Sequence, residues 1–157
     1  MEKVYHPYRM QDKEVEFLFK FIPRAKVFID LFGGSGVVSR YARSNCNYKE
    51  TIYNDKRYFL KKIDRVSVFH EDYTEILGFA DKNTIIFADP PFYAYPDDLD
   101  KWSTKDTVML IKKLEDMDAK VFMLNTKTVQ RFMNEQWKVL AQWKFRRLKD
   151  VVLFYKP

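Results

Sequence analysis

The sequence has few of the residues that build covalent or metal-held scaffolds. It contains one cysteine, Cys46, and two histidines, His6 and His70, in 157 residues. A single cysteine excludes an internal disulfide and a zinc site made of several cysteines. We therefore expect no bound metal and a reducing, intracellular (cytoplasmic) setting. An isolated histidine is more often structural than catalytic, and we assign neither histidine a role.

Long apolar runs are also missing. No stretch approaches the roughly 20 apolar residues that cross a bilayer. The first residues, MEKVYHPYRMQDKEVEFLF, carry charges throughout and lack the apolar core of a signal peptide. We expect a soluble protein without membrane contact. The length, without repeats or linkers, suits one domain over 1–157, and the apolar fraction of 46% is enough for a buried core.

Positive charge is in excess and is concentrated in one segment. The formal net charge is +6 and the pI is about 9.2. Between positions 127 and 149 there is one acid, Glu135, and the basic residues are Lys127, Arg131, Lys138, Lys144, Arg146, Arg147 and Lys149. Aromatic residues lie among them, although some of these fall in expected strands and suit a core. Many small proteins are modestly basic, but this local mixture favours phosphate contacts and base stacking, and hence a nucleic-acid partner.

Apolar runs alternate with amphipathic stretches, which predicts an α/β fold. The expected strands are 26–32, 51–55, 66–70, 84–89, 120–125, 138–145 and 151–156. The expected helices are roughly 12–22, 35–44, 56–63, 73–79, 104–117 and 127–134. The turn between the last two strands is too short for a parallel crossover, so that pair must be antiparallel. We predict a seven-stranded, mostly parallel sheet with a C-terminal antiparallel hairpin and helices on both faces. In such sheets ligands bind beyond the carboxyl ends of the strands.

A glycine-rich turn follows the first expected strand, in the sequence Asp30-Leu31-Phe32-Gly33-Gly34-Ser35-Gly36. It holds three of the four glycines of the chain. Glycine permits positive φ and lets a ligand approach the backbone. The spacing matches neither the dinucleotide fingerprint nor a P-loop. The turn could serve tight connectivity alone, but the carboxylate of Asp30 beside it suits a ligand with ammonium or hydroxyl groups.

Two further acids end the next two strands. Asp55 follows the second strand, where it is placed to accept hydrogen bonds from ribose hydroxyls. Asp72 follows the third strand, where it would accept from an adenine amino group. Either acid could instead be the N-cap of the helix expected after it.

The tetrapeptide Asp89-Pro90-Pro91-Phe92 ends the fourth strand and is the most specific signal in the chain. Two prolines remove two backbone donors and fix φ near −65°, so neighbouring carbonyls are presented rigidly. A rigid turn alone would not explain why an acid and an aromatic residue flank the prolines.

In this order, the glycine turn and the tetrapeptide resemble the motifs of the Dam-like (D12-class) adenine-N6 DNA methyltransferases. The resemblance covers nearly the whole chain, from about Tyr5 to Pro157. It implies the Rossmann-like fold of class I S-adenosylmethionine-dependent methyltransferases. It also implies S-adenosylmethionine as cofactor and methyl transfer to the N6 amino group of adenine in DNA.

The resemblance also implies roles for individual residues. The target base would be held by Asp89, Pro90, Pro91 and Phe92. The cofactor would be bound by Tyr8, Lys13, Asp30, Phe32, Gly33, Gly34, Ser35, Gly36, Asp55 and Asp72. Within that set, Asp55 would hold the ribose and Asp72 the adenine. We expect nucleic acid to contact Tyr93, Tyr95, Lys127, Arg131, Lys144, Arg146 and Arg147.

The chain departs from the family pattern in three places. The N-terminal motif keeps Tyr8 and Lys13 but lacks the usual glycines. The tetrapeptide closes with Phe92 where tyrosine is commoner, which keeps a stacking face. Residues 37–88 leave no room for the target-recognition domain that family members carry in this interval. Sequence specificity is therefore expected to be loose or to come from a partner subunit.

Two other functions fit the same residues. One is a different amino-methyltransferase, acting on cytosine N4, on adenine in RNA or on a protein glutamine amide, because the tetrapeptide suits any planar amino group. The basic C-terminal segment argues against a protein substrate. The other is a catalytically silent module that binds cofactor or a partner in a larger complex. The intact Asp89 and glycine turn argue against it.

Overall fold

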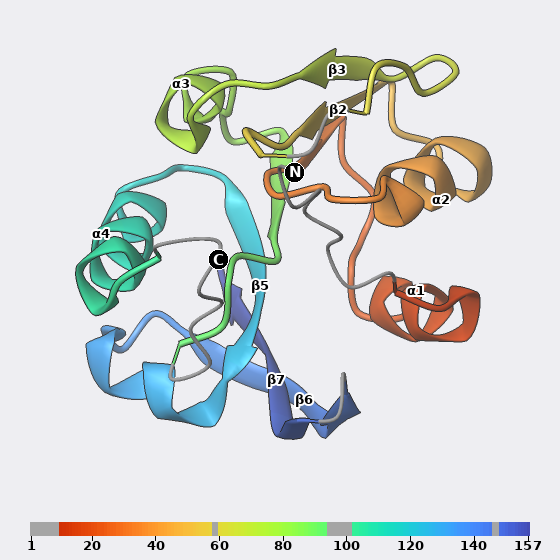
Figure 1. The fold of residues 1–157 in the computed structure, drawn as a ribbon. Coiled ribbons are helices and arrows are strands. Elements are labelled where there is room, and N and C mark those ends of the chain that lie inside the picture. Colours follow the sequence, from red (N-terminus) through yellow and green to blue (C-terminus); the bar gives the residue numbers. More distant parts are fainter. Residues whose placement is uncertain (1–9, 58–59, 94–101, 146–147) are drawn as a thin grey trace, which may run out of the picture.

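The sheet is the centre of the molecule. The computed structural model describes residues 10–57, 60–93, 102–145 and 148–157, with only the backbone of 145 and 148–150. The strands are β1 (Val27–Asp30), β2 (Glu50–Asn54), β3 (Ser67–Phe69), β4 (Thr84–Ala88), β5 (Lys120–Thr126), β6 (Lys138–Phe145) and β7 (Leu148–Lys156). They form one seven-stranded sheet in the order β3-β2-β1-β4-β5-β7-β6. The first five are parallel, and β7 is antiparallel to both β5 and β6, which confirms the predicted sheet and hairpin (Figure 1).

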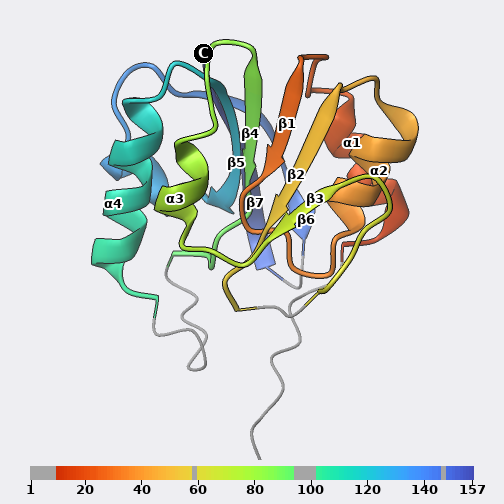
Figure 2. The same ribbon diagram turned by 90° about the horizontal axis from the view of Figure 1, so that it is seen from above.

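Helices cover both faces of the sheet. On one side lie α1 (Asp12–Phe19) and α2 (Val37–Asn45), and on the other α3 (Tyr73–Leu77) and α4 (Thr104–Glu115) (Figure 2). Successive side chains of β4 enter the two cores in turn: Ile85 and Phe87 pack on the side of α1 and α2, and Ile86 and Ala88 on the side of α3 and α4. Alternating strand residues point to opposite faces, so a strand covered on both faces needs apolar residues throughout.

The predicted helix over 56–63 is wrong. The residues described in this interval form no helix, and the chain makes a turn in which Ile63 pairs with Val66. Leu60 and Ile63 have helical spacing, but their side chains pack against Gly36, where a Cβ would lie 2.8 Å from Leu60 Cδ2 and 3.0 Å from Ile63 Cδ1. The tertiary contact thus decides the local conformation. The segment expected to be a helix over 127–134 is a shorter 3₁₀ helix, η1 (Lys127–Phe132).

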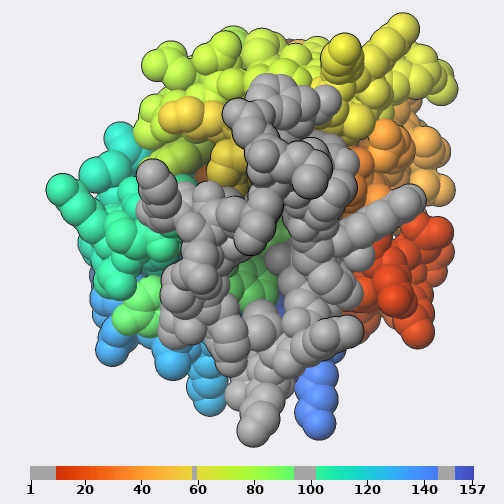
Figure 3. Space-filling view, in the orientation of Figure 1, coloured from red at the N-terminus to blue at the C-terminus, as the bar shows by residue number. Residues whose placement is uncertain are grey.

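The parallel strands end at one edge of the sheet, which we call the carboxyl edge. The strands converge on this edge in Figure 2, and Figure 3 looks onto the same face, with green atoms of the chain around β4 and the residues after it near its centre. Asp30 ends β1, and Asp55 and Asp89 directly follow β2 and β4. None of the helices in the described part of the chain has the length and apolar character that a membrane crossing needs.

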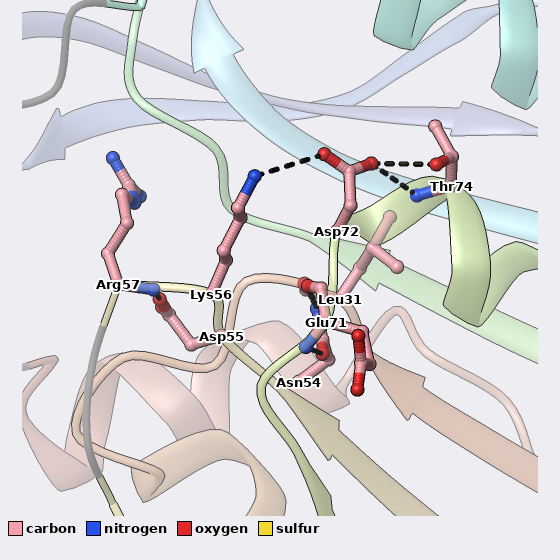
Figure 4. A network of polar contacts seen from close by, with 8 residues as sticks. All are labelled: Leu31, Asn54, Asp55, Lys56, Arg57, Glu71, Asp72 and Thr74. Carbon is pink, nitrogen blue, oxygen red and sulfur yellow. Dashed lines mark hydrogen bonds and ion pairs between the residues drawn. The ribbon is translucent and has the colours of Figure 1, made fainter.

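Asn54 holds the loops at this edge together (Figure 4). Its Nδ2 donates to the Leu31 carbonyl at 3.3 Å and to the Glu71 carbonyl at 3.0 Å, and its Oδ1 accepts from the Glu71 N–H at 2.9 Å. Only 1% of Asn54 is exposed. Backbone groups that lose such a partner without gaining water are costly.

We predict that Asn54→Ala lowers the free energy of unfolding by about 2–4 kcal/mol, because it leaves buried backbone groups without partners. Urea denaturation measures this change. The matched control is Asn47→Ala, since Asn47 is exposed, and we expect it to change stability by less than about 0.5 kcal/mol. Equal effects of the two substitutions would contradict the role of Asn54.

Candidate active site

The glycine turn joins β1 to α2 in an unusual backbone conformation. Gly34 and Gly36 have φ of +50° and +83°, and Gly36 is the N-cap of α2. A Cβ on Gly33 would lie 2.3 Å from the ring of Tyr53, whose hydroxyl donates to the Gly34 carbonyl. Gly33 is therefore required by a side chain of the protein itself. Gly36 shapes the turn but lines neither of the cavities described below.

Three carboxylates meet at a cavity of about 80 Å³ beside this turn. Asp30 is 1% exposed and accepts a 2.7 Å hydrogen bond from Ser39 Oγ. Asp55 accepts from the Gly34 and Arg57 N–H groups at 3.0 and 2.9 Å. The cavity is lined by Met10, Asp30, Phe32, Gly33, Gly34, Ser35, Val37, Val38, Asp55, Arg57, Phe87, Asp89, Pro90, Pro91 and Phe92.

This concentration of acids affects ionisation. Burial raises the pKa of Asp30 to about 7; the hydrogen bond from Ser39 opposes the rise, and the charges of Asp89 and Asp55 add to it. Desolvation disfavours the charged form of a carboxyl group, and like charges nearby do the same. A cationic group in the cavity would relieve both effects, so the site is suited to a ligand that carries positive charge.

A second cavity of about 490 Å³ lies next to the first. Three residues, Phe32, Asp55 and Arg57, line both. The other described residues that line the second cavity are Asn54, Lys56, Glu71, Asp72, Tyr73, Thr74, Trp102, Asp106 and Met109. Its volume is in the range of small-molecule and cofactor sites.

An aromatic cluster forms one wall of the second cavity. The ring centroid of Phe32 lies 5.6 Å from that of Tyr73 and 5.8 Å from that of Trp102. Such rings offer faces on which a nucleobase stacks. The sequence reasoning missed Tyr73 and Trp102. Trp102 lies two residues before α4, far along the chain from Phe32, and only the fold brings the two together.

The structure distinguishes the two acids, Asp55 and Asp72, that could each have been a helix N-cap. No helix follows Asp55 in the described residues, so it is not an N-cap, and its carboxylate braces the glycine turn. Asp72 does cap α3: its Oδ1 accepts from the Thr74 N–H at 3.0 Å and from Thr74 Oγ1 at 2.7 Å (Figure 4). Its Oδ2 lies 3.6 Å from Lys56 Nζ. Asp72 also lines the second cavity, so capping does not remove it from the site.

Most predicted site residues gather at these cavities. The tetrapeptide, Asp89 to Phe92, lines the smaller cavity, and Phe92 is 7% exposed. Lys13 does not join them: it is exposed in the first turn of α1 and lines neither cavity. The predictions for Tyr8, Tyr95, Arg146 and Arg147 lie outside the described residues.

Asn125 and Thr126 fix the residue that follows the tetrapeptide. Asn125 is fully buried, and its Oδ1 accepts from the Tyr93 and Thr126 N–H groups at 3.0 and 2.8 Å. Thr126 Oγ1 donates to the Tyr93 carbonyl at 3.1 Å. The sequence reasoning missed both residues, although they close the apolar run of β5 at the same edge as the acids.

The described members of the predicted nucleic-acid surface lie at the carboxyl edge. Lys127 and Arg131 belong to η1, directly after β5. The Arg131 guanidinium donates to the Tyr93 hydroxyl and lies 4.8 Å from the ring centroid of Phe132. The register aligns Thr126 with Val151 and Val151 with Trp143, so Lys144, the next residue of β6, lies at this edge too. The described residues contain no group of His, Cys, Asp and Glu side chains arranged to hold a metal.

Comparisons with known proteins identify the fold. No family model matches the chain, and no curated protein matches it. Among solved structures, a protein of Escherichia coli described as a methyltransferase, yhhF, is 19% identical with a TM-score of 0.59, and the alignment covers 96% of this chain and 88% of that one. This chain has a methyltransferase fold.

Two further structures agree. A protein of Streptococcus mutans described as a methyltransferase and solved in complex with SAH is 15% identical, with a TM-score of 0.57 and coverage of 94% and 99%. An rRNA methylase of Streptococcus thermophilus is 11% identical, with a TM-score of 0.57 and coverage of 90% and 93%. The chain thus has the predicted Rossmann-like fold of class I methyltransferases. At these identities the likeness establishes the fold, and the substrates remain properties of those proteins.

The raised pKa of Asp30 predicts a pH-dependent stability. The ordinary pKa of an aspartate is 3.8, and the pKa of Asp30 in the folded protein is about 7. Between these two pH values the folded protein keeps a proton on Asp30 that the unfolded chain releases. Folding stability from this group therefore falls as pH rises through that window. Asp30→Asn keeps an acceptor for Ser39 but cannot ionise. We predict that the stability of this variant, relative to that of the native protein, increases from pH 4 to pH 8. Thermal melts at several pH values measure the difference, and a pH-independent difference would contradict the assignment.

Proposed function

We propose that this protein is an S-adenosylmethionine-dependent methyltransferase that acts on an exocyclic amino group in nucleic acid, namely N6 of adenine. The main observation behind this proposal is that the Asp89–Phe92 tetrapeptide lines the same cavity as the glycine turn and its acids, at the carboxyl edge. Under this proposal, the tetrapeptide that would hold a planar amine and the acids that would take a cationic ligand lie side by side. The methyltransferase fold and the Dam-like motifs support the same reaction.

The residues present fit the cofactor. Its methionine part carries an ammonium and a sulfonium, and the smaller cavity offers the carboxylates of Asp30, Asp55 and Asp89. Its adenosine part suits the larger cavity, which has an aromatic wall and includes Asp72 among its acids. A carboxylate offers about four lone-pair positions, and Asp55 lines both cavities, so it is placed to accept from ribose hydroxyls. When bound, S-adenosylmethionine supplies an electrophilic methyl group.

The tetrapeptide prepares the target nitrogen. The lone pair of an exocyclic amino group is delocalised into the base, which makes the nitrogen a poor nucleophile. If the Asp89 carboxylate and the Pro90 carbonyl accept its two hydrogens, the nitrogen moves toward tetrahedral geometry and its lone pair is turned outward. The charge of Asp89 also stabilises the positive charge that grows on this nitrogen. Orientation of this kind lowers a barrier by as much as about 7–11 kcal/mol.

A base inside a duplex must leave its stack before it reaches Asp89, at a cost of a few kcal/mol. Stacking on the ring of Phe92 would offset about 1–3 kcal/mol of that cost. Tyr93, held by Asn125 and Thr126, lies next to this ring in the chain. Lys127, Arg131 and Lys144 are exposed at the same edge and suit contacts to the phosphate backbone.

The direct test is transfer of labelled methyl from S-adenosylmethionine to mixed-sequence DNA and RNA, followed by nucleoside mass analysis. We expect N6-methyladenine in DNA and a loss of at least about 100-fold in Asp89→Ala and Asp89→Asn. Asp118→Asn, an exposed acid outside both cavities, is the control and should keep native activity.

Each product has a distinct meaning. N6-methyladenine found only in RNA would support the proposed reaction but would identify RNA, not DNA, as the substrate. N4-methylcytosine would change the target base. Cofactor binding without transfer to either polymer would point to a silent module, or to a partner subunit that supplies target recognition, and adding cell extract to the assay separates these two.

The basic edge predicts a salt-dependent affinity. We expect Lys144→Ala to weaken binding to DNA of any sequence and to reduce the slope of log affinity against log salt by about 1. Lys138→Ala is a matched control, because Lys138 is also exposed on β6 but pairs with Tyr155 at the opposite edge of the sheet. Fluorescence anisotropy at several salt concentrations measures both slopes. Equal slopes for the two variants would remove Lys144 from the nucleic-acid surface.

A further inference from the structure

The cofactor site contains an imbalance of charge that points to one side chain. Besides its ammonium and sulfonium, the methionine part of S-adenosylmethionine carries a carboxylate. The smaller cavity presents three acids, which suit the two cations and repel the carboxylate. Arg57 is the sole cationic side chain among the described residues that line this cavity.

Arg57 is positioned by the loop that follows β2. Its N–H donates to Asp55 Oδ1 at 2.9 Å, so its backbone is tied to the acid that braces the glycine turn. Its side chain is half-buried and lines both cavities. Figure 4 shows it extending from the loop beside Lys56 and away from the carboxylate of Asp55. A guanidinium is always charged and presents paired donors that match a carboxylate.

Two other cations in the described part of the chain are less well placed for this role. Lys56 lines only the larger cavity, and its Nζ lies 3.6 Å from Asp72. Lys13, which the family motif suggested, is exposed on α1 and lines neither cavity. Arg57 thus stands where the ligand carboxylate needs compensation for the surrounding acids.

We propose that Arg57 binds the carboxylate of the cofactor's methionine part and so selects S-adenosylmethionine over its decarboxylated form. This inference rests on the proposed function, because it concerns the same cofactor. In physical terms, removal of Arg57 leaves a carboxylate facing Asp30, Asp55 and Asp89, whereas a ligand without the carboxylate loses nothing. The change in the preference between the two ligands when Arg57 is replaced therefore reports on Arg57.

The experiment is isothermal titration calorimetry with S-adenosylmethionine and with decarboxylated S-adenosylmethionine, which keeps the sulfonium and the amine. We expect the native protein to bind the carboxylated ligand more tightly. In Arg57→Gln, affinity for S-adenosylmethionine should fall about 10- to 100-fold, while affinity for the decarboxylated form changes less than about threefold. Arg57→Lys should lie between the two. Lys61→Ala, an exposed cation of the same loop that lines neither cavity, should match the native protein.

Each alternative outcome overturns the inference in a recognisable way. Equal losses for both ligands in Arg57→Gln, with an unchanged melting temperature, would mean that Arg57 only shapes the loop. Unchanged affinity for both ligands together with weaker DNA binding would assign Arg57 to a phosphate of the target strand. A native protein that binds neither ligand would overturn the proposed function itself, and the inference with it.

Discussion

Negative charge held out of water at the carboxyl edge is the constraint on which the rest of the site depends. An unpaired charge in the interior is costly, and both Asp30 and Asp55 are almost completely buried. The structure meets this cost with donors from the glycine turn and from α2: Ser39 Oγ for Asp30 and the Gly34 N–H for Asp55. The conformation of the turn is therefore one that directs the Gly34 N–H at Asp55. Asp30, whose pKa burial raises to about 7, reduces stability near neutral pH, a cost that functional sites often carry.

The layered fold explains why the chemistry lies at this edge. Helices cover both faces of the sheet, and the strands between them carry apolar side chains that pack in two cores. A ligand can reach the sheet only where strands stop and the chain turns. Polar residues that close apolar runs, such as Asp30, Asp89 and Asn125, are thus the ones with access to chemistry. β5 adds Asn125 to this row by pairing in parallel with β4.

The sheet could be predicted from the sequence, whereas the conformations of the loops could not. Buried runs such as 84–88 admit few conformations, and a short turn leaves the hairpin no choice but antiparallel pairing. The helix predicted over 56–63 was wrong because Leu60 and Ile63, which have helical spacing, pack on Gly36 instead. The spacing of residues along the sequence cannot reveal such a contact. Arg57 could have been suspected from its place two residues after Asp55. The direction of its side chain, and the absence of Lys13 from the lining of both cavities, follow only from the fold.

The contact between Gly33 and Tyr53 limits how this sequence can vary. The ring occupies the space of a Cβ at position 33, so a larger residue there requires a smaller one at position 53. A smaller residue at position 53 would in turn lose the hydroxyl that donates to the Gly34 carbonyl. Two positions twenty residues apart are therefore expected to change together in any set of relatives, and a sequence that keeps only one of the pair would need a different turn.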